Sequence, residues 1–121
     1  MSQSDCVFCK IIDGKIPSPR VAEDSDFICI RDIQPQAEKH LLVIPKNHVA
    51  SLKEVFPEQN ARTEDQEMIS RLFSFAGRVA WKEGLLPGGY RSVINTGHEG
   101  GQTVFHLHLH LLGGKLRSTF G

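Results

Sequence analysis

The stretch from residue 104 to residue 112 reads VFHLHLHLL, and its strict alternation decides the fold prediction. Such alternation is typical of a β-strand, because successive side chains of a strand point to opposite faces of the sheet. One face of this strand carries apolar side chains and the other carries imidazoles: Phe105, Leu107, Leu109 and Leu111 against His106, His108 and His110. Burial explains the apolar face, but it gives no reason for three histidines about 6–7 Å apart along the strand.

Half of the chain's six histidines lie within the five residues 106–110, which is a poor fit to a solvated polar face. Two chemical interpretations remain. Neutral imidazoles on a strand can ligate zinc. An imidazole nitrogen can also attack phosphorus as a nucleophile, while neighbouring imidazoles orient it and move protons near neutral pH. The sequence by itself leaves both interpretations open.

A glycine-rich segment, TGHEGGQ at residues 96–102, precedes the histidines. Its glycines permit unusual backbone angles, and bare backbone N–H groups can approach phosphate oxygens closely. Most glycine-rich turns are only turns. A Gly-Gly turn that leads directly into three aligned histidines favours phosphate chemistry over a metal site.

The rest of the chain predicts an α+β fold. Residues 6–14 predict a short helix that ends at Gly14, and residues 63–84 predict a long amphipathic helix. Strands are predicted at residues 20–23, 27–31, 40–44, 90–95 and 104–112. Short connections between successive strands favour an antiparallel sheet of about five strands with the long helix on one face.

Length and composition predict a single domain over residues 1–121. Fourteen basic residues balance fourteen acidic residues, which argues against nucleic-acid binding through a basic surface. No apolar run approaches the ~20 residues of a membrane span, and the first ten residues lack the pattern of a signal peptide. An odd number of cysteines, three, then favours reduced thiols and a cytoplasmic protein.

The histidine strand, HLHLHLL at residues 106–112, matches the His-φ-His-φ-His-φ-φ signature of the histidine-triad (HIT) family. Other segments resemble the Hint branch of that family, and together they cover roughly residues 6–115. These segments are KII at 10–12 with IP at 16–17, RDI at 31–33 with PQA at 35–37, His40 with LVIPK at 42–46, GYR at 89–91, Asn95, and LGG at 112–114.

The resemblance implies a homodimer in which the two sheets join into one continuous sheet. It also implies hydrolysis of the P–N bond of purine nucleoside 5′-phosphoramidates, with no cofactor required for catalysis. On this reading His108 is the nucleophile that takes the nucleotidyl group, and His106 and His110 flank it. His40 matches the family's fourth histidine, which supports the leaving group and proton transfer; a structural role for it is the alternative.

The resemblance also implies a nucleotide site. Asp32 matches the acid that holds the ribose hydroxyls, although an Asp before Ile33-Gln34-Pro35 also fits a turn cap. Polar residues around the phosphate correspond to Asn95, Gln102 and Thr103, of which Asn95 could instead bond the loop backbone and Thr103 could be a plain strand residue. An apolar slot for the base corresponds to Phe8, Ile11, Phe27 and Ile33.

Cys6 and Cys9 form a C-x-x-C motif that resembles a zinc-binding variant of some HIT relatives. By position, His48 and His106 would complete a tetrahedral Cys₂His₂ site, with His98 as the alternative fourth ligand. Such a set is a closed, structural zinc site, which would leave His108 for chemistry. Two plain helix residues, one turn apart, are the alternative for the cysteines.

Three other functions compete with the phosphoramidase. One is a nucleotide-binding regulatory protein in which catalysis is incidental. Another is a dinucleoside polyphosphate hydrolase of the neighbouring HIT branch, which the short chain and the Gly-Gly ending of the motif disfavour. The third is a zinc hydrolase that uses the three histidines as ligands, which predicts that a chelator abolishes turnover.

Overall fold

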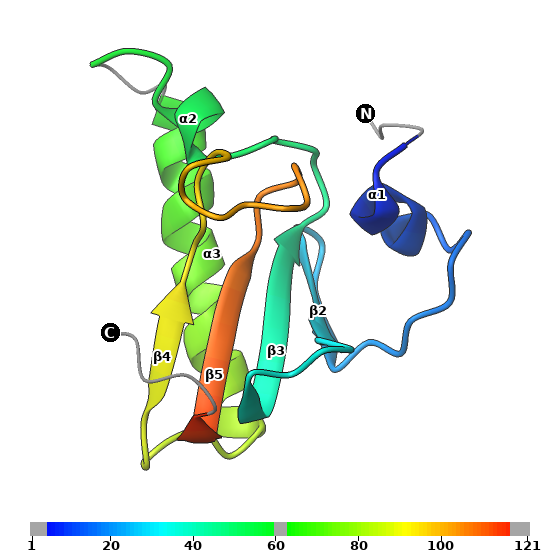
Figure 1. Cartoon of the computed structure of the whole chain (residues 1–121), viewed down its shortest axis with the longest axis vertical. Coiled ribbons are helices and arrows are strands. Elements are labelled where there is room, and N and C mark those ends of the chain that lie inside the picture. Colours follow the sequence, from blue (N-terminus) through cyan, green and yellow to red (C-terminus); the bar gives the residue numbers. More distant parts are fainter. Residues whose placement is uncertain (1–4, 60–62, 117–121) are drawn as a thin grey trace.

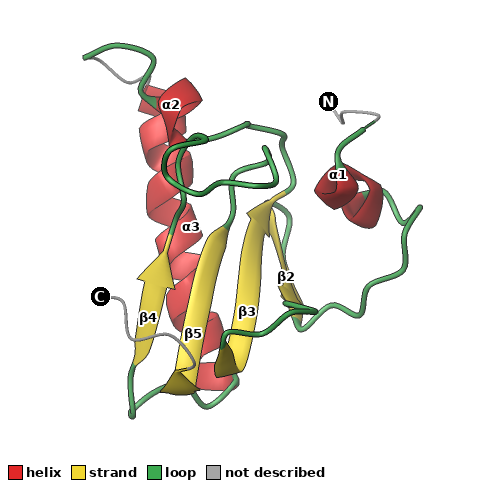
Figure 2. Cartoon of the chain, in the orientation of Figure 1, coloured by secondary structure: helices red, strands yellow, loops and turns green. Residues whose placement is uncertain are grey.

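A computed structural model of the chain describes residues 5–59 and 63–116, and it has a five-stranded antiparallel sheet flanked by helices (Figures 1 and 2). The strand order is β1-β2-β3-β5-β4. The elements are α1 (Val7–Ile12), β1 (Ala22–Glu23), β2 (Phe27–Arg31), β3 (Ala37–Pro45), α2 (Leu52–Val55), α3 (Thr63–Lys82), β4 (Tyr90–Val93) and β5 (Leu109–Leu116). This architecture confirms the predicted α+β fold class and adds the short helix α2, for which no prediction was made.

The long helix α3 runs along one face of the sheet (Figure 1). Its apolar stripe packs on every second residue of the central strands, as the strand and helix periods require. This buried layer includes Phe27 and Cys29 of β2, Leu41 and Val43 of β3, Leu109 and Leu111 of β5, and Leu72, Phe75 and Val79 of α3. The layer confines all chemistry to the opposite face.

The opposite face is only partly covered, because α1 is short and lies over β2 and β3 (Figure 1). Phe8 and Ile11 of α1 pack there on Ile30 and Leu42, in a second apolar cluster that also includes Ile28 and Ile44. Among the described residues, no helix lies over the part of this face formed by β5 and β4. His110 of β5 therefore lies at the boundary between a covered and an open surface.

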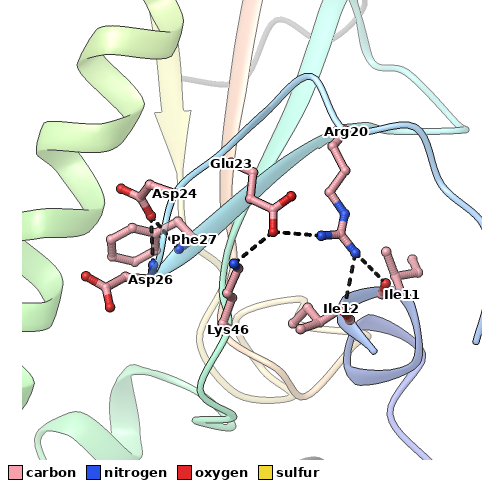
Figure 3. A network of polar contacts seen from close by, with 8 residues as sticks. All are labelled: Ile11, Ile12, Arg20, Glu23, Asp24, Asp26, Phe27 and Lys46. Atoms are coloured by element: carbon pink, nitrogen blue, oxygen red, sulfur yellow. Dashed lines mark hydrogen bonds and ion pairs between the residues drawn. The ribbon is translucent and has the colours of Figure 1, made fainter. Parts of the chain in front are cut away.

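A polar network holds α1 in place (Figure 3). Arg20 donates to the carbonyls of Ile11 and Ile12 at the end of α1, at 2.8 and 3.3 Å. It also pairs with Glu23 at 3.0 Å, and Glu23 pairs with Lys46 at 2.8 Å. Lys46 and Arg20 together lower the pKa of Glu23. The network thus ties the end of α1 to the residue that follows β3.

The sequence prediction for β5 is wrong at its beginning, since the strand starts at Leu109 and not at residue 104. β3 ends at Pro45, which has no N–H to donate to a ladder. The backbone N–H of Leu107 donates instead to the Val49 carbonyl, at 2.7 Å. Phe105, predicted to share the buried face, is consequently 48% exposed.

Within the described ranges, no helix combines the length and the apolar character needed to cross a bilayer.

Candidate active site and metal site

The structure brings the three histidines of the signature together, with His106 and His108 beneath Phe8 of α1. The rings of His108 and His110 are 4.9 Å apart between centroids. The ring of Phe8, in α1, meets both His106 and His108 edge-on, at centroid distances of 5.9 and 5.0 Å. His106 and His108 are almost completely buried, at 0% and 8% exposure. The helix therefore shields these imidazoles from bulk water on one side.

His108 has a defined tautomer. Its Nδ1 lies 2.7 Å from the backbone carbonyl oxygen of His106. A carbonyl oxygen can only accept, so Nδ1 carries the proton and Nε2 carries the lone pair. Burial lowers the pKa of His108, outweighing the opposing effects of the His106 carbonyl and of Asp32. The ring is therefore a neutral imidazole with a basic nitrogen, which is the form that acts as a nucleophile.

His40 and His110 form a hydrogen-bonded pair beside it. The Gln36 backbone N–H donates to His40 Nδ1 at 3.0 Å, which places the His40 proton on Nε2. That Nε2 is 2.9 Å from His110 Nδ1 and 3.4 Å from Asp32 Oδ2. Burial lowers the pKa of both histidines, and for His110, with the charges of His108 and His40 adding to burial, it falls to about 4. A neutral His110 consequently keeps its own proton on Nε2.

Cys6, Cys9, His48 and His106 converge on one point, with their ligand atoms all within 4.8 Å of one another. His106 Nδ1 is 3.3 Å from Cys6 Sγ, 3.5 Å from Cys9 Sγ and 3.1 Å from His48 Nδ1. Zinc bond lengths of ~2.0–2.3 Å imply edges of about 3.3–3.8 Å in a tetrahedral Cys₂His₂ site. The distances from His106 Nδ1 to the other three ligand atoms are within a few tenths of an ångström of these edges, which fits a tetrahedral zinc ion.

The surroundings of His106 match a zinc ligand as well. Its Nε2 is 2.8 Å from the Pro45 carbonyl oxygen, so Nε2 carries the proton and the Nδ1 lone pair faces the cysteines. Burial lowers the pKa of His106 to about 4 and also lowers the pKa of His48, which keeps both rings in the neutral form that binds metal. His98 is exposed in the glycine-rich segment and does not belong to the cluster.

The predicted phosphate-binding residues divide into different environments. Asn95 lines a cavity beside His110 and donates to the Gly100 carbonyl at 2.9 Å. Gln102 is buried, and it donates to the Ala50 and Val104 carbonyls and accepts from the Gly97 N–H. With both of its amide N–H groups bonded to backbone carbonyls, Gln102 holds the glycine-rich segment in place. Thr103 lies away from Asn95, in a separate surface depression next to Cys6 and His48.

Asp32 occupies a position consistent with both interpretations of it. Oδ1 accepts the Gln34 N–H at 2.8 Å, which is the predicted turn cap. Oδ2 faces His40. The carboxylate therefore has a structural bond on one oxygen and a histidine contact on the other.

The predicted apolar slot needs one correction. Phe8 and Ile11 lie together, but Phe27 packs on Phe75 beneath α3, on the opposite face of the sheet. Strand alternation explains the error, because residues an odd number of positions apart face opposite sides of a strand. Phe27 is an odd number of positions from Asp32, whereas Ile30 is an even number away and faces the same side as Asp32. Ile30, which packs with Phe8 and Ile11, was missed although counting back from Asp32 would have found it. Ile33 projects from the turn after β2 and is 94% exposed.

A cavity of about 880 Å³ adjoins the paired histidines. His40, His110 and Asn95 line it, together with two residues that the sequence analysis did not single out, Gln36 and Arg91. The cavity is therefore large enough for a small-molecule group that reaches the His40–His110 pair.

Comparison with known proteins gives concordant matches. Residues 5–121 match the family model described as "Scavenger mRNA decapping enzyme C-term binding". A purine nucleoside phosphoramidase of Escherichia coli (strain K12) is 38% identical over 111 residues, which are 92% of this chain and 88% of that protein.

Two solved structures are similar over most of their lengths. A histidine triad protein from Clostridium difficile superimposes with a TM-score of 0.88 at 36% identity, covering 100% of both chains. A zinc-bound histidine triad family protein from Mycobacterium smegmatis gives a TM-score of 0.71 at 36% identity, covering 92% of this chain and 76% of that one.

Proposed function

Because the chain belongs to the histidine-triad family, we propose that it is a hydrolase that cleaves the P–N bond of purine nucleoside 5′-phosphoramidates. The observation that carries this proposal is the tautomer of His108. A neutral imidazole whose proton is held on Nδ1 presents Nε2 as a nucleophile, and the His40–His110 pair lies beside it. A regulatory protein that only binds nucleotides would need neither arrangement.

In the proposed first step, His108 Nε2 attacks phosphorus and forms an N–P bond. The bond from phosphorus to the amine nitrogen breaks, and its electron pair leaves with that nitrogen. The nitrogen takes the Nε2 proton of His110, which leaves the His40–His110 pair one proton short until the attacking water of the second step returns it. Burial of these groups strengthens their interaction with the developing charge.

In the second step, a water molecule attacks the nucleotidyl-histidine. Its oxygen bonds to phosphorus, the bond to His108 breaks, and the water proton passes to the His40–His110 pair. The products are a nucleoside monophosphate and the amine. His40 contributes by holding the tautomer of His110, which its Gln36 and Asp32 contacts define in turn.

The test of this function is a substrate panel on the purified protein. We expect turnover of the adenosine and guanosine 5′-phosphoramidates of tryptamine, and much slower release of AMP from diadenosine polyphosphates. Preference for the dinucleotide would favour the neighbouring HIT branch. Tight AMP binding without turnover of any compound would favour the regulatory protein.

For the nucleotide, we propose that Asp32 binds the ribose hydroxyls and that the base lies near Phe8, Ile11, Ile30 and Ile33. An apolar side chain that is 94% exposed, such as Ile33, gains from a covering ring. Asn95 lines the same cavity as His110 and serves as the phosphate-side polar residue. Gln102 is not part of the proposed phosphate site, because both of its amide N–H groups donate to backbone carbonyls.

Replacing Asp32 with asparagine is expected to raise KM for the adenosine compound about tenfold, since a charged acceptor of two hydroxyl bonds is lost. The diagnostic comparison is a 2′,3′-dideoxyadenosine substrate. For the wild type, kcat/KM should be about tenfold lower on the dideoxy substrate than on the adenosine substrate. For Asp32→Asn, the two substrates should give nearly the same kcat/KM. Asp26→Asn, an exposed aspartate in the β1–β2 turn, is the matched control. An equal dideoxy penalty in wild type and Asp32→Asn would remove Asp32 from the ribose site.

We further propose that Cys6, Cys9, His48 and His106 hold a zinc ion, which the geometry of the four ligand atoms fits. When bound, the ion supplies a structural cross-link between α1, the residues after β3 and the segment before β5. His106 would then have two roles, because its ring is a ligand and its carbonyl orients His108.

The homodimer is retained as a proposal. The outer strands β1 and β4 leave backbone groups for pairing with a second sheet. On α3, Phe73 and Trp81 are 46% and 63% exposed, and a partner could cover them.

A further inference from the structure

The proposed base site has one side on a helix and the other on the sheet. Phe8 and Ile11 belong to α1, whereas Ile30 belongs to β2 and Ile33 to the turn after it. A base that contacts both sides requires α1 to stay at a fixed distance from the sheet. α1 has six residues, and a helix this short does not keep its place through its own hydrogen bonds. Contacts with other segments must therefore set the spacing of the base site.

The two ends of α1 are held in different ways. At the beginning of the helix, Cys6 and Cys9 belong to the Cys₂His₂ cluster. At its end, Arg20 donates from one terminal nitrogen to the carbonyls of Ile11 and Ile12, at 2.8 and 3.3 Å. The side chain of Ile11 is part of the base site, and its own carbonyl is a partner of Arg20. The end of α1 that carries this base contact is therefore held by Arg20.

Arg20 is itself fixed to the sheet. The next residue, Val21, donates its N–H to the Cys29 carbonyl of β2 at 2.8 Å. The other terminal nitrogen of the Arg20 guanidinium lies 3.0 Å from Oε2 of Glu23, in β1 (Figure 3). Lys46, which directly follows β3, is 2.8 Å from the same oxygen of Glu23. The Arg20 guanidinium thus joins the end of α1 to the sheet, and Glu23 orients it.

This network is suited to positioning more than to overall stability. The side chains of Arg20 and Glu23 are 27% and 40% exposed, and an exposed ion pair by itself contributes little to the free energy of unfolding. The planar guanidinium, however, directs one nitrogen toward the helix carbonyls and the other toward the carboxylate. A lysine ammonium is a single point charge and cannot reproduce that fork. Loss of the network should therefore shift α1 without unfolding the sheet.

We propose that Arg20, oriented by Glu23, is a positioning residue that sets the spacing between α1 and β2 and thereby the affinity for the base. This inference rests on the proposed phosphoramidase function and adds to it two residues that act on the base through α1. The bond changes do not depend on them, because the tautomer of His108 is set by the His106 carbonyl. A substitution in the network should accordingly raise KM and leave kcat nearly unchanged.

The test compares the tryptamine phosphoramidates of adenosine 5′-monophosphate and of 1-deoxyribose 5-phosphate, in which hydrogen replaces the base. The ratio of their kcat/KM values measures the contribution of the base, and any loss of folded protein cancels in this ratio. For Arg20→Met we expect the ratio to fall about tenfold, with kcat for the adenosine compound within about twofold of wild type. Arg20→Lys should give an intermediate ratio. Arg71→Met, which removes an ion pair of α3 with Asp26, is the matched control and should keep the wild-type ratio.

Glu23→Gln tests the link within the network, because it keeps the shape of the side chain and removes its charge. It should lower the ratio as well, and the double variant Arg20→Met/Glu23→Gln should have the same ratio as Arg20→Met alone. Hydrogen exchange followed by mass spectrometry gives a readout that does not use catalysis. In Arg20→Met, the backbone amides of α1 should exchange faster than in wild type, whereas those of β2 should exchange at the wild-type rate.

Three results would overturn the inference. An unchanged ratio in Arg20→Met would show that the network does not act on the base. Equal losses for the two substrates, with faster exchange in β2 as well as α1, would make Arg20 a residue of general stability. A double variant whose loss equals the product of the two single losses would show that Glu23 does not act through Arg20.

The compound without a base also separates this inference from the function on which it rests. Its turnover by the wild type supports the phosphoramidase, whatever the ratio is. If neither compound is turned over, the proposed function fails. Calorimetric binding of AMP and of 1-deoxyribose 5-phosphate to wild type and Arg20→Met then tests the inference without catalysis. The preference for AMP should fall about tenfold in Arg20→Met, and an unchanged preference would overturn the inference.

Discussion

Replacing His108 with alanine is expected to lower kcat for adenosine tryptamine phosphoramidate by about 10⁴-fold or more, as loss of a covalent nucleophile typically does. No neighbouring group can substitute for it. His106 Nδ1 faces the cysteines and its Nε2 bonds the Pro45 carbonyl. His110 Nδ1 is bonded to His40. Among these three histidines, His108 alone has a lone pair that faces neither the cysteines nor another histidine, and its Nδ1 is held by the His106 carbonyl.

The measurement is steady-state turnover together with mass spectrometry of acid-sensitive adducts after a rapid quench. Wild type should carry one AMP on the peptide that contains His108, and His108→Ala should carry none. AMP binding should survive in His108→Ala, because the ribose and base contacts are made elsewhere. His98→Ala, an exposed histidine outside the site, serves as the control and should retain full turnover. Turnover of His108→Ala equal to wild type would mean that another residue is the nucleophile.

Replacing Cys9 with serine is expected to remove the metal and to cause the largest loss of stability among the variants considered. Cys9 Sγ is buried and lies 3.3 Å from His48 Nδ1 and 3.5 Å from His106 Nδ1. A ligand at a thousand times its Kd stabilises the folded state by about 4 kcal/mol. For a chain of this size we expect Tm to fall by about 10–20 °C.

Zinc content by atomic emission and thermal unfolding check this expectation. The wild type should contain one zinc per chain, and Cys9→Ser should contain almost none. Cys29→Ala is the matched control, since burial raises the pKa of that thiol to about 12 and keeps it protonated beneath α3. It should retain one zinc even if the core loses some stability. A full equivalent of zinc in Cys9→Ser would exclude the Cys₂His₂ site.

Treating the wild-type protein with a chelator distinguishes a structural metal from a catalytic one. Because His108 is outside the metal cluster, chelation should lower turnover by less than about tenfold, through looser orientation by the His106 carbonyl. Complete loss of turnover, with AMP binding intact, would favour the zinc hydrolase.

Local sequence patterns predicted much of the fold, and the failures have identifiable causes. β2 was predicted at residues 27–31 and is observed at Phe27–Arg31. The alternation around the histidines also predicted a strand, but pairing stops where Pro45 offers no N–H. That interruption depends on a residue some sixty positions away, so the alternating pattern itself carries no sign of it.

In the candidate site, too, local sequence patterns predict some features, and other features depend on contacts between distant segments. The types of residue in the histidine segment, and the resemblance built on them, predict His108 as the nucleophile and His106 as a candidate ligand. The sequence could not predict the histidine tautomers, because they depend on the particular acceptors that the fold brings to each ring nitrogen. The choice between His106 and His98 as fourth ligand likewise required the relative placement of α1 and the segment before β5.

Periodicity is a local property of the chain, and for that reason the residue order alone determined the α+β class, the strand that contains His110 and the amphipathic helix α3. Contacts between distant segments follow from packing, which no local pattern encodes. In the packed structure, Phe27 lies beneath α3, and Ile30 lies beside Phe8. The amide of Gln102 is hydrogen-bonded to the backbone of other segments.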